Sequence, residues 1–157
     1  MGEGEPHFLL RLAGMSDIST VVAIAEDCGL SFWSSESYAA ELDNPDVLFF
    51  CAEVEDAVRG FAIGRFVHDA DNGDELEVYN IGISAEIRRR GLGQALLRRF
   101  IEKARERGGS AIWLEVRESN LTAIRFYESV GFSKVYERPS FYLNPTENAL
   151  VLRLDLI

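Results

Sequence analysis

Apolar and polar residues follow two repeating patterns along this chain, and each pattern predicts a different kind of element. Apolar residues three or four positions apart, as in Ile18, Val21, Val22 and Ala25, are typical of one face of a helix. Short runs rich in β-branched and aromatic residues are typical of strands. We expect strands near 8–12, 47–54, 59–67, 78–84, 111–116, 132–142 and 149–156. Helices are expected from Ser16-Asp17 to Gly29, over 34–42, from Leu92 to Gly108 and from Ser119-Asn120 to Gly131.

Both kinds of element alternate along the whole chain. This alternation predicts an α/β or α+β fold, in which a sheet has helices on both faces. A short hairpin turn is expected at Glu55-Asp56, and the acidic segment 69–74 is expected to be a loop. No repeat or linker divides the sequence, so residues 1–157 are predicted to form a single domain.

Composition narrows the class of protein. Apolar residues make up 47% of the 157 residues and charged residues 27%, which is ordinary for a globular protein. No apolar run approaches the roughly 20 residues of a membrane helix. The acidic start, 1–6, does not resemble a signal peptide, so we expect a cytoplasmic protein that binds no membrane. The two cysteines, Cys28 and Cys51, are not spaced as metal ligands, and with only two histidines beside them no metal site is expected.

Charge is distributed unevenly between the two halves of the sequence. The net charge of −10 argues against nucleic acid as a direct partner. Residues 1–80 hold 17 acidic and 3 basic residues, whereas residues 81–157 hold 9 acidic and 13 basic ones. The C-terminal half therefore suits an anionic ligand and the N-terminal half a cationic one, although such an imbalance can also serve solubility alone.

A glycine-rich turn joins an apolar strand pattern to a helical one at Arg88-Arg89-Arg90-Gly91-Leu92-Gly93. Glycines allow a tight turn and a close approach of the backbone to a ligand. The first amides of the following helix lack intrahelical acceptors and lie at the positive end of its dipole. With arginines at its mouth, the turn suits a pyrophosphate, although many turns of this kind need glycine for geometry alone.

Two polar residues stand where packing alone would not place them. Glu115 lies within the apolar strand pattern of 111–116, and Tyr127 follows twelve residues later on the next predicted helix. A buried carboxylate needs a partner such as Arg117, a wet cleft or a raised pKa. A structural ion pair and an ordinary core tyrosine are the alternative to a catalytic role.

The motifs together resemble the GNAT superfamily of acetyl-CoA-dependent N-acetyltransferases. Residues 88–93 fit its Q/R-x-x-G-x-G/A motif, and the strand before, the helix after and the later segment Asn120 to Phe132 occur in the family's order. Within the superfamily, Trp113 to Asn120 and Tyr127-Glu128-Ser129-Val130-Gly131-Phe132 are similar to the bacterial RimI-type ribosomal-protein alanine N-acetyltransferases. Phe32-Trp33-Ser34 resembles that group's Pro-Trp-Ser element, with Phe32 in place of proline. The resemblance covers nearly the whole chain and implies a mixed, mostly antiparallel sheet of about seven strands with about four helices.

The resemblance also implies roles for particular residues. Glu115 would be the general base and Tyr127 the general acid. Acetyl-CoA would be the acetyl donor, with no metal, and its pantetheine arm would pair with the backbone of Ile81, Gly82 and Ile83. Asn120 would hold the cofactor further along. The CoA pyrophosphate would be held by the turn and its flanks, namely Arg88, Arg89, Arg90, Gly91, Leu92, Gly93 and Gln94.

The acceptor expected from the resemblance is the N-terminal α-amine of a basic protein, such as a small-subunit ribosomal protein that begins with Ala. An α-amine has a pKa of about 8, so roughly a tenth of it is neutral at pH 7, whereas a lysine with a pKa of about 10.4 is almost wholly protonated. Acidic residues could attract a basic tail, among them Glu36, Glu41, Asp43 and the loop 69–74, while Tyr136, Arg138, Phe141 and Tyr142 could flank its first residue. A lysine or small-molecule acetyltransferase, and a non-catalytic acetyl-CoA-binding or partner-binding module, remain alternatives.

Overall fold

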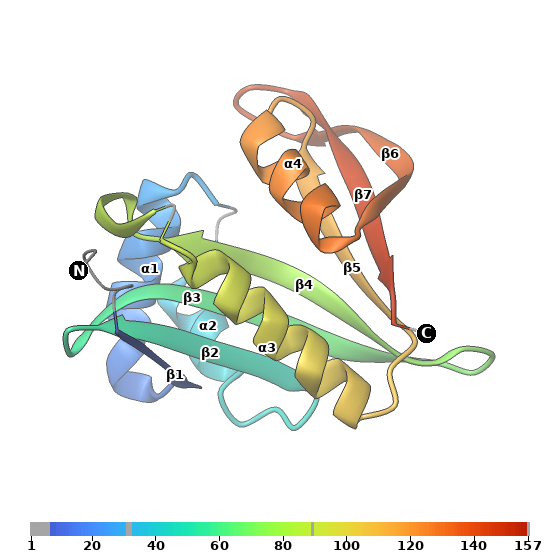
Figure 1. Ribbon diagram of the computed structural model, residues 1–157. Coiled ribbons are helices and arrows are strands. Elements are labelled where there is room, and N and C mark those ends of the chain that lie inside the picture. The colour runs from blue at the N-terminus through green and yellow to red at the C-terminus, as the bar shows by residue number, and fades with distance from the viewer. Residues whose placement is uncertain (1–6, 31–32, 89, 157) are drawn as a thin grey trace, which may run out of the picture. The chain divides into compact units, whose positions relative to one another are not determined.

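The computed structural model describes residues 7–30, 33–88 and 90–156. Seven strands form one sheet in the order β1-β2-β3-β4-β5-β7-β6 (Figure 1). The β1–β2, β2–β3, β5–β7 and β6–β7 pairs are antiparallel, and β4 and β5 are parallel. The strands are β1 (Phe8–Leu12), β2 (Val47–Val54), β3 (Ala57–Asp69), β4 (Gly73–Ile83), β5 (Ala111–Arg117), β6 (Ser133–Tyr142) and β7 (Glu147–Asp155). The predicted mixed, mostly antiparallel sheet of about seven strands is confirmed.

Four α-helices and two 3-10 turns connect these strands among the described residues. The α-helices are α1 (Ile18–Asp27), α2 (Ser35–Ala40), α3 (Leu92–Glu106) and α4 (Leu121–Val130), and the 3-10 turns are η1 (Met15–Asp17) and η2 (Ala85–Ile87). Each helix lies within the segment in which its apolar spacing was found. Contacts divide the chain into two compact units, the first comprising residues up to Phe66 with Tyr79–Glu102, and the second Val67–Val78 with 103–157.

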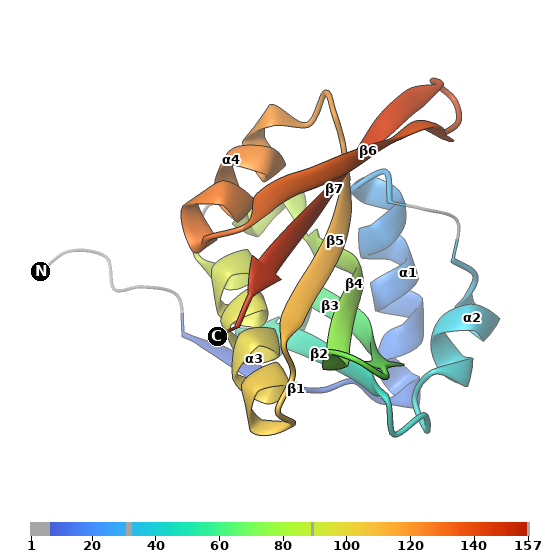
Figure 2. The ribbon, with the colours of Figure 1, turned by 90° about the vertical axis from the view of Figure 1, so that its right-hand side faces the viewer.

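In the first unit, helices cover both faces of the strands. The α1 and α2 helices lie on one face of β2 and β3, and α3 lies on the other (Figure 2). This arrangement follows from the period of two in a strand. Phe49 of β2 and Phe61 of β3 join the buried cluster that includes Val21 and Tyr38, whereas the neighbouring Phe50 faces Phe100 of α3, with ring centroids 6.2 Å apart. Both faces of these strands are therefore apolar, and the unit has a helix layer on each side.

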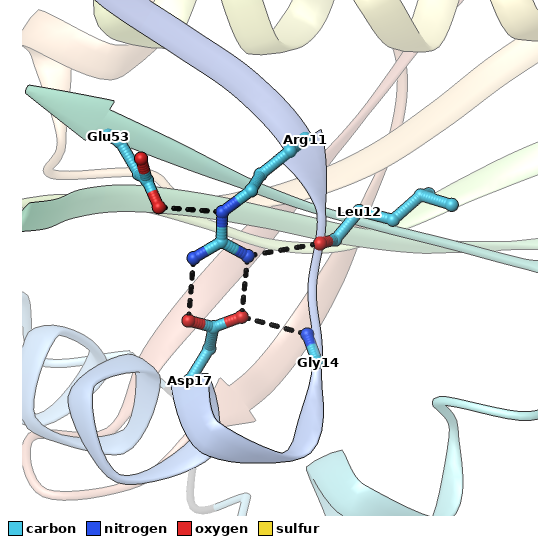
Figure 3. Close-up of polar contacts among 5 residues, drawn as sticks. All are labelled: Arg11, Leu12, Gly14, Asp17 and Glu53. Carbon is cyan, nitrogen blue, oxygen red and sulfur yellow. Dashed lines mark hydrogen bonds and ion pairs between the residues drawn. The ribbon is translucent and has the colours of Figure 1, made fainter. Parts of the chain in front are cut away.

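A partly buried ion-pair network joins the edge strand to the start of α1 (Figure 3). The Arg11 guanidinium donates to both carboxylate oxygens of Asp17, at 2.7 and 2.8 Å, and its Nε donates to Glu53 at 2.7 Å. Asp17 is buried and also accepts the Gly14 amide at 2.8 Å. These bonds keep the pKa of Asp17 below its usual value, chiefly through the hydrogen bonds from Arg11. The network ties β1 to β2 and to η1, the 3-10 turn that leads into α1.

In the second unit, β5 lies between β4 and β7, and β6 forms the edge. Side chains of β5 alternate between buried and half-buried positions, so that Ile112, Leu114 and Val116 are buried while Glu115 is half-buried. The side chain of Asn120 caps α4 by accepting the Ala123 amide at 3.2 Å. Gly131 ends this helix in the left-handed conformation, at φ 119°. Both ends of α4 thus follow the sequence signals predicted for them.

The acidic segment differs from the predicted loop. The strands β3 and β4 extend to Asp69 and from Gly73, so only a short turn separates them. Asp69 Oδ1 accepts the amides of Asp71 and Asn72, at 2.8 and 3.0 Å, and Gly73 takes a positive φ of 79°. A side chain that accepts backbone amides replaces a longer loop here. The prediction of no signal peptide concerns residues 1–6, which lie outside the described residues.

Candidate functional site

The end of β4 and the glycine-rich turn lie together in the first unit. Gly82 is buried, and a Cβ on it would lie 2.7 Å from Phe61 Cε1 and 3.2 Å from Ile24 Cγ2. The packing around Gly82 therefore excludes a side chain, whatever ligand the strand binds. The backbone of Ile81, Gly82 and Ile83 was predicted to pair with pantetheine. Of these three residues, Ile83 has a carbonyl that already accepts two hydrogen bonds, from Arg88 Nε at 3.1 Å and from Cys28 Sγ at 3.3 Å.

The turn itself has the backbone geometry expected of an anion cradle. Gly91 has a φ of 87°, a conformation that favours glycine, and its carbonyl accepts the Ala95 amide at 3.0 Å. The amides of Leu92, Gly93 and Gln94 stand in the first turn of α3, where an α-helix offers them no acceptor. Leu92 is buried, so its side chain anchors the helix and only its amide can serve a ligand. Arg90 and Gln94 are exposed, and Arg89 lies outside the described residues.

Glu115 has a different partner from the one suggested by the sequence. Its carboxylate lies 3.2 Å from Arg138 Nη1, whereas Arg117 pairs with Glu147 at 3.3 Å. Glu115 and Arg117 lie on one strand, whereas Arg138 belongs to β6, two strands away from β5, so only its long side chain can reach Glu115. Arg117 and Arg138 both stand opposite the small Ala149 of the intervening β7. The suggested pairing of Glu115 with Arg117 was wrong.

Burial raises the pKa of Glu115 above the ordinary carboxylate value. The positive charge of Arg138 opposes this effect, and the nearby negative charge of Glu77 adds to it. The sequence offered a charged partner, a wet cleft or a raised pKa as alternatives for this carboxylate. Glu115 has both an ion-pair partner and a raised pKa. A half-buried carboxylate with a raised pKa suits a general base better than a fully solvated one does.

Tyr127 lies in the second unit, as Glu115 and Asn120 do. Its ring packs against those of Phe126 and Phe132, with centroids 5.3 and 5.8 Å away. Burial raises the pKa of Tyr127 to about 12, with a further contribution from Tyr142. The phenol therefore keeps its proton at neutral pH, as a general acid must.

The aromatic hairpin predicted to flank an acceptor belongs to β6 and its end. Tyr136 and Phe141 are exposed, and the Arg138 guanidinium carbon lies 5.5 Å from the centre of the Phe141 ring. Tyr142 is half-buried beneath the Arg117 guanidinium, at 4.3 Å, and its pKa is raised to about 12 by burial and by the charge of Glu115. The sequence placed these residues in one hairpin but did not link Arg138 or Tyr142 to Glu115, because that link passes across β7.

The described residues were also compared with the requirements of a metal site and of a membrane-spanning helix. No group of three or more His, Cys, Asp or Glu side chains is placed to hold a metal ion there. None of the described helices has the length and apolar character needed to cross a bilayer.

Comparison with known proteins identifies the family. The model of the acetyltransferase (GNAT) family matches residues 18–132, which include parts of both units. The chain belongs to the GNAT acetyltransferase family. This confirms the resemblance seen in the glycine-rich turn and the segment up to Phe132, and with it the prediction of an enzyme of the acyltransferase class.

The chain is similar in sequence or in structure to several named acetyltransferases. The ribosomal protein bS18 alanine N-acetyltransferase of Escherichia coli K12 is 34% identical over 128 residues, covering 79% of this chain and 81% of that protein. The crystal structure of the ribosomal-protein-S18-alanine N-acetyltransferase from Escherichia coli matches 96% of this chain and 94% of that one, with a TM-score of 0.84 and 29% identity. Arabidopsis thaliana NAA60 in complex with acetyl-CoA has the same fold, with a TM-score of 0.84 at 18% identity over 95% of this chain and 98% of that one.

Proposed function

We propose that this GNAT protein transfers the acetyl group of acetyl-CoA to the N-terminal α-amine of a basic protein, such as a small-subunit ribosomal protein that begins with Ala. The observation that carries the catalytic part of the proposal is Glu115, a half-buried carboxylate on β5 that lies 3.2 Å from Arg138. The relative from Escherichia coli, named for alanine acetylation of bS18, supports the same acceptor class. Such a substrate would be met in the cytoplasm, where we place the enzyme.

The proposed donor site follows the end of β4 and the glycine-rich turn. We assign the CoA pyrophosphate to the first amides of α3 and to the arginines beside them, because these groups combine a helix N-terminus with fixed positive charge. The pantetheine arm is assigned to backbone groups of Ile81, Gly82 and Ile83. The Ile83 carbonyl already accepts hydrogen bonds from Cys28 and Arg88. Asn120 uses its Oδ1 to cap α4, which leaves its Nδ2 as the group for the cofactor. The pyrophosphate residues proposed are Arg88, Arg89, Arg90, Gly91, Leu92, Gly93 and Gln94.

Glu115 is proposed to take the proton of the attacking amine. Acetyl transfer from a thioester needs a neutral amine, and a carboxylate can accept the proton directly or through a water. The ion pair with Arg138 keeps Glu115 available as a carboxylate, since a positive charge favours the ionised form. No covalent enzyme intermediate is required.

Tyr127 is proposed to donate its phenolic proton, first in a hydrogen bond, to the sulfur of the departing CoA thiolate. A phenol with a pKa of about 12 that protonates a thiolate, whose conjugate acid has a pKa of about 8.5, transfers its proton uphill by roughly 5 kcal/mol. Donation of a hydrogen bond to the developing negative charge carries no such cost. We therefore assign Tyr127 first to stabilising the departing sulfur by a hydrogen bond. A proton that passes to CoA as it leaves is replaced on the phenol from solvent, because a phenol with a pKa of about 12 is protonated at neutral pH.

The acidic N-terminal half gives the acceptor proposal a second support. A basic peptide would be drawn toward it, and such steering weakens as salt screens the charges. Lysine side chains and small amines are the competing acceptors, because the same donor chemistry serves them.

The test is mass spectrometry of a peptide panel incubated with the enzyme and acetyl-CoA. Peptides that begin with Ala followed by basic residues should be acetylated on the α-amine faster than acidic ones, and the difference should shrink as salt rises. A peptide with a blocked N-terminus and a free lysine should react poorly, because little of its amine is neutral at pH 7. Efficient reaction of the blocked peptide, or of spermidine-like amines alone, would refute the N-terminal acceptor and leave acetyl transfer standing.

A further inference from the structure

Three residues from separate segments form a closed hydrogen-bonded group beside the glycine-rich turn. Arg88 Nε donates to the Ile83 carbonyl at 3.1 Å, and Arg88 Nη2 donates to Cys28 Sγ at 3.3 Å. The Cys28 thiol donates in turn to the same Ile83 carbonyl, also at 3.3 Å. Cys28 follows α1, Ile83 ends β4 and Arg88 opens the turn, so the group joins three elements of the first unit.

The donors and acceptors of this group match in number. A carbonyl oxygen has two lone pairs, and the Ile83 carbonyl uses both of them here. A thiol offers one weak donor and a weakly accepting sulfur, and Cys28 uses both. The group therefore needs no further partner to hold Arg88 against the end of β4.

The bonds occupy only one edge of the Arg88 guanidinium. A guanidinium carries five N–H donors in a planar fork, and Nε with one N–H of Nη2 forms one side of it. The two N–H groups of Nη1 and the second of Nη2 remain for another acceptor. Among the described residues, no carboxylate forms an ion pair with Arg88, and its side chain is exposed. The open edge has the two parallel donors that bind a phosphate in bidentate fashion.

We propose that Cys28 is a positioning residue for the donor site, which orients Arg88 so that its open edge faces the pyrophosphate of CoA. This inference rests on the proposed use of acetyl-CoA. An arginine side chain has several rotatable bonds, and ordering it on binding costs conformational entropy. A guanidinium that is already held on one edge loses less freedom when the phosphate arrives, so the affinity for CoA is higher. Cys28 does not touch the cofactor in this account.

A purely structural role for Cys28 predicts different behaviour. Cys28 is half-buried and packs against the same apolar cluster as the fully buried Cys51. If Cys28 only filled space there, its removal would lower thermal stability without changing the affinity for CoA. Cys51 therefore provides a matched control, because it is the other thiol of the same cluster and makes no contact with Arg88.

The experiment is a double-mutant cycle on the full chain, read by calorimetry with CoA as the only ligand. Cys28→Ala should weaken CoA binding by about twofold to tenfold, the effect of losing one ordinary hydrogen bond, because a thiol is a weak partner. Arg88→Ala should weaken binding more strongly. In the Arg88→Ala background, Cys28→Ala should have no further effect, because residues that act through each other are not additive. Cys28→Ser, which keeps a donor and an acceptor, should recover part of the affinity, and Cys51→Ala should bind CoA as the wild type does.

The outcomes separate this inference from the proposed function. If Cys28→Ala binds CoA as tightly as the wild type, or if its effect persists in full without Arg88, Cys28 does not position Arg88. Equal weakening by Cys51→Ala would likewise overturn the inference, since loss of packing would then be the cause. If the wild type itself does not bind CoA, the donor assignment fails and this inference fails with it. No acceptor is needed, so an incorrect choice of acceptor leaves the test intact.

Discussion

Replacement of Glu115 by glutamine tests the proposed base most directly. Gln has nearly the same shape, so the pairing of residue 115 with Val151 in the sheet should be kept. The change removes the carboxylate that pairs with Arg138 at 3.2 Å, and with it the only ionisable group of this side chain. General base catalysis contributes about 10²-fold to 10⁴-fold. Because roughly a tenth of an α-amine is already neutral at pH 7, we expect a loss near the lower end, about 10²-fold in kcat/KM.

The pH dependence gives this prediction its sharpest form. Between pH 7 and pH 9 the neutral fraction of an amine with a pKa of about 8 rises roughly tenfold. The Glu115→Gln variant should recover by about that factor, because it depends on amine that is already neutral. The wild type should gain less, since its carboxylate can accept the proton of the bound ammonium form.

The assay is release of CoA with an Ala-initiated basic peptide, measured from pH 7 to pH 9. The control is Glu106→Gln, which removes an exposed carboxylate that pairs with Lys103 on the last turn of α3, and which should keep the wild-type rate and pH profile. A Glu115→Gln variant with the wild-type rate, or one whose profile parallels that of the wild type, would show that Glu115 does not accept the proton.

Three further changes test other parts of the structure. Tyr127→Phe keeps the ring between Phe126 and Phe132, so kcat should fall about 10²-fold or more while the melting temperature stays unchanged; a parallel fall of both would indicate a packing role. Asp17→Asn should cost about 2–3 kcal/mol in urea denaturation at pH 7, less than a fully buried ion pair because Arg11 is partly exposed. Since the folded-state pKa of Asp17 is lowered, its stabilisation is present above the unfolded pKa and lost as pH falls through the folded value; a gap between variant and wild type that stays constant into acid would contradict this. Gly91→Ala should strain the backbone at φ 87° by about 1–2 kcal/mol and weaken CoA binding in calorimetry, although a Cβ there would meet no atom within 4 Å; unchanged affinity and melting temperature would refute the need for glycine.

Local patterns in the sequence were sufficient for most of the fold. The apolar spacing that predicted a helix after the glycine-rich turn corresponds to α3, and the caps predicted at Asn120 and Gly131 are the ends of α4. These signals involve residues within a few positions of each other, so they can be read without knowledge of the rest of the chain. The acidic segment was less predictable, because the backbone amides accepted by Asp69 allowed β3 and β4 to extend into it.

Several residues of the candidate site could also be found from the sequence alone. Gly91, the start of α3, Glu115 and Tyr127 were found from the sequence, through a motif and through polar residues in apolar surroundings, and their catalytic and binding roles remain predictions. The family was recognisable for the same reason, since its motifs are short and occur in a fixed order.

The sequence by itself determined which segments form strands, which segments form helices and which family the chain belongs to. Only the tertiary structure decided that Glu115 pairs with Arg138 across β7, and that Cys28 meets Arg88 sixty positions later in the chain. The physical reason is the range of the interactions. Periodicity and capping depend on neighbours along the chain, whereas ion pairs and hydrogen bonds between elements depend on strand order and register, which place distant residues a few ångströms apart.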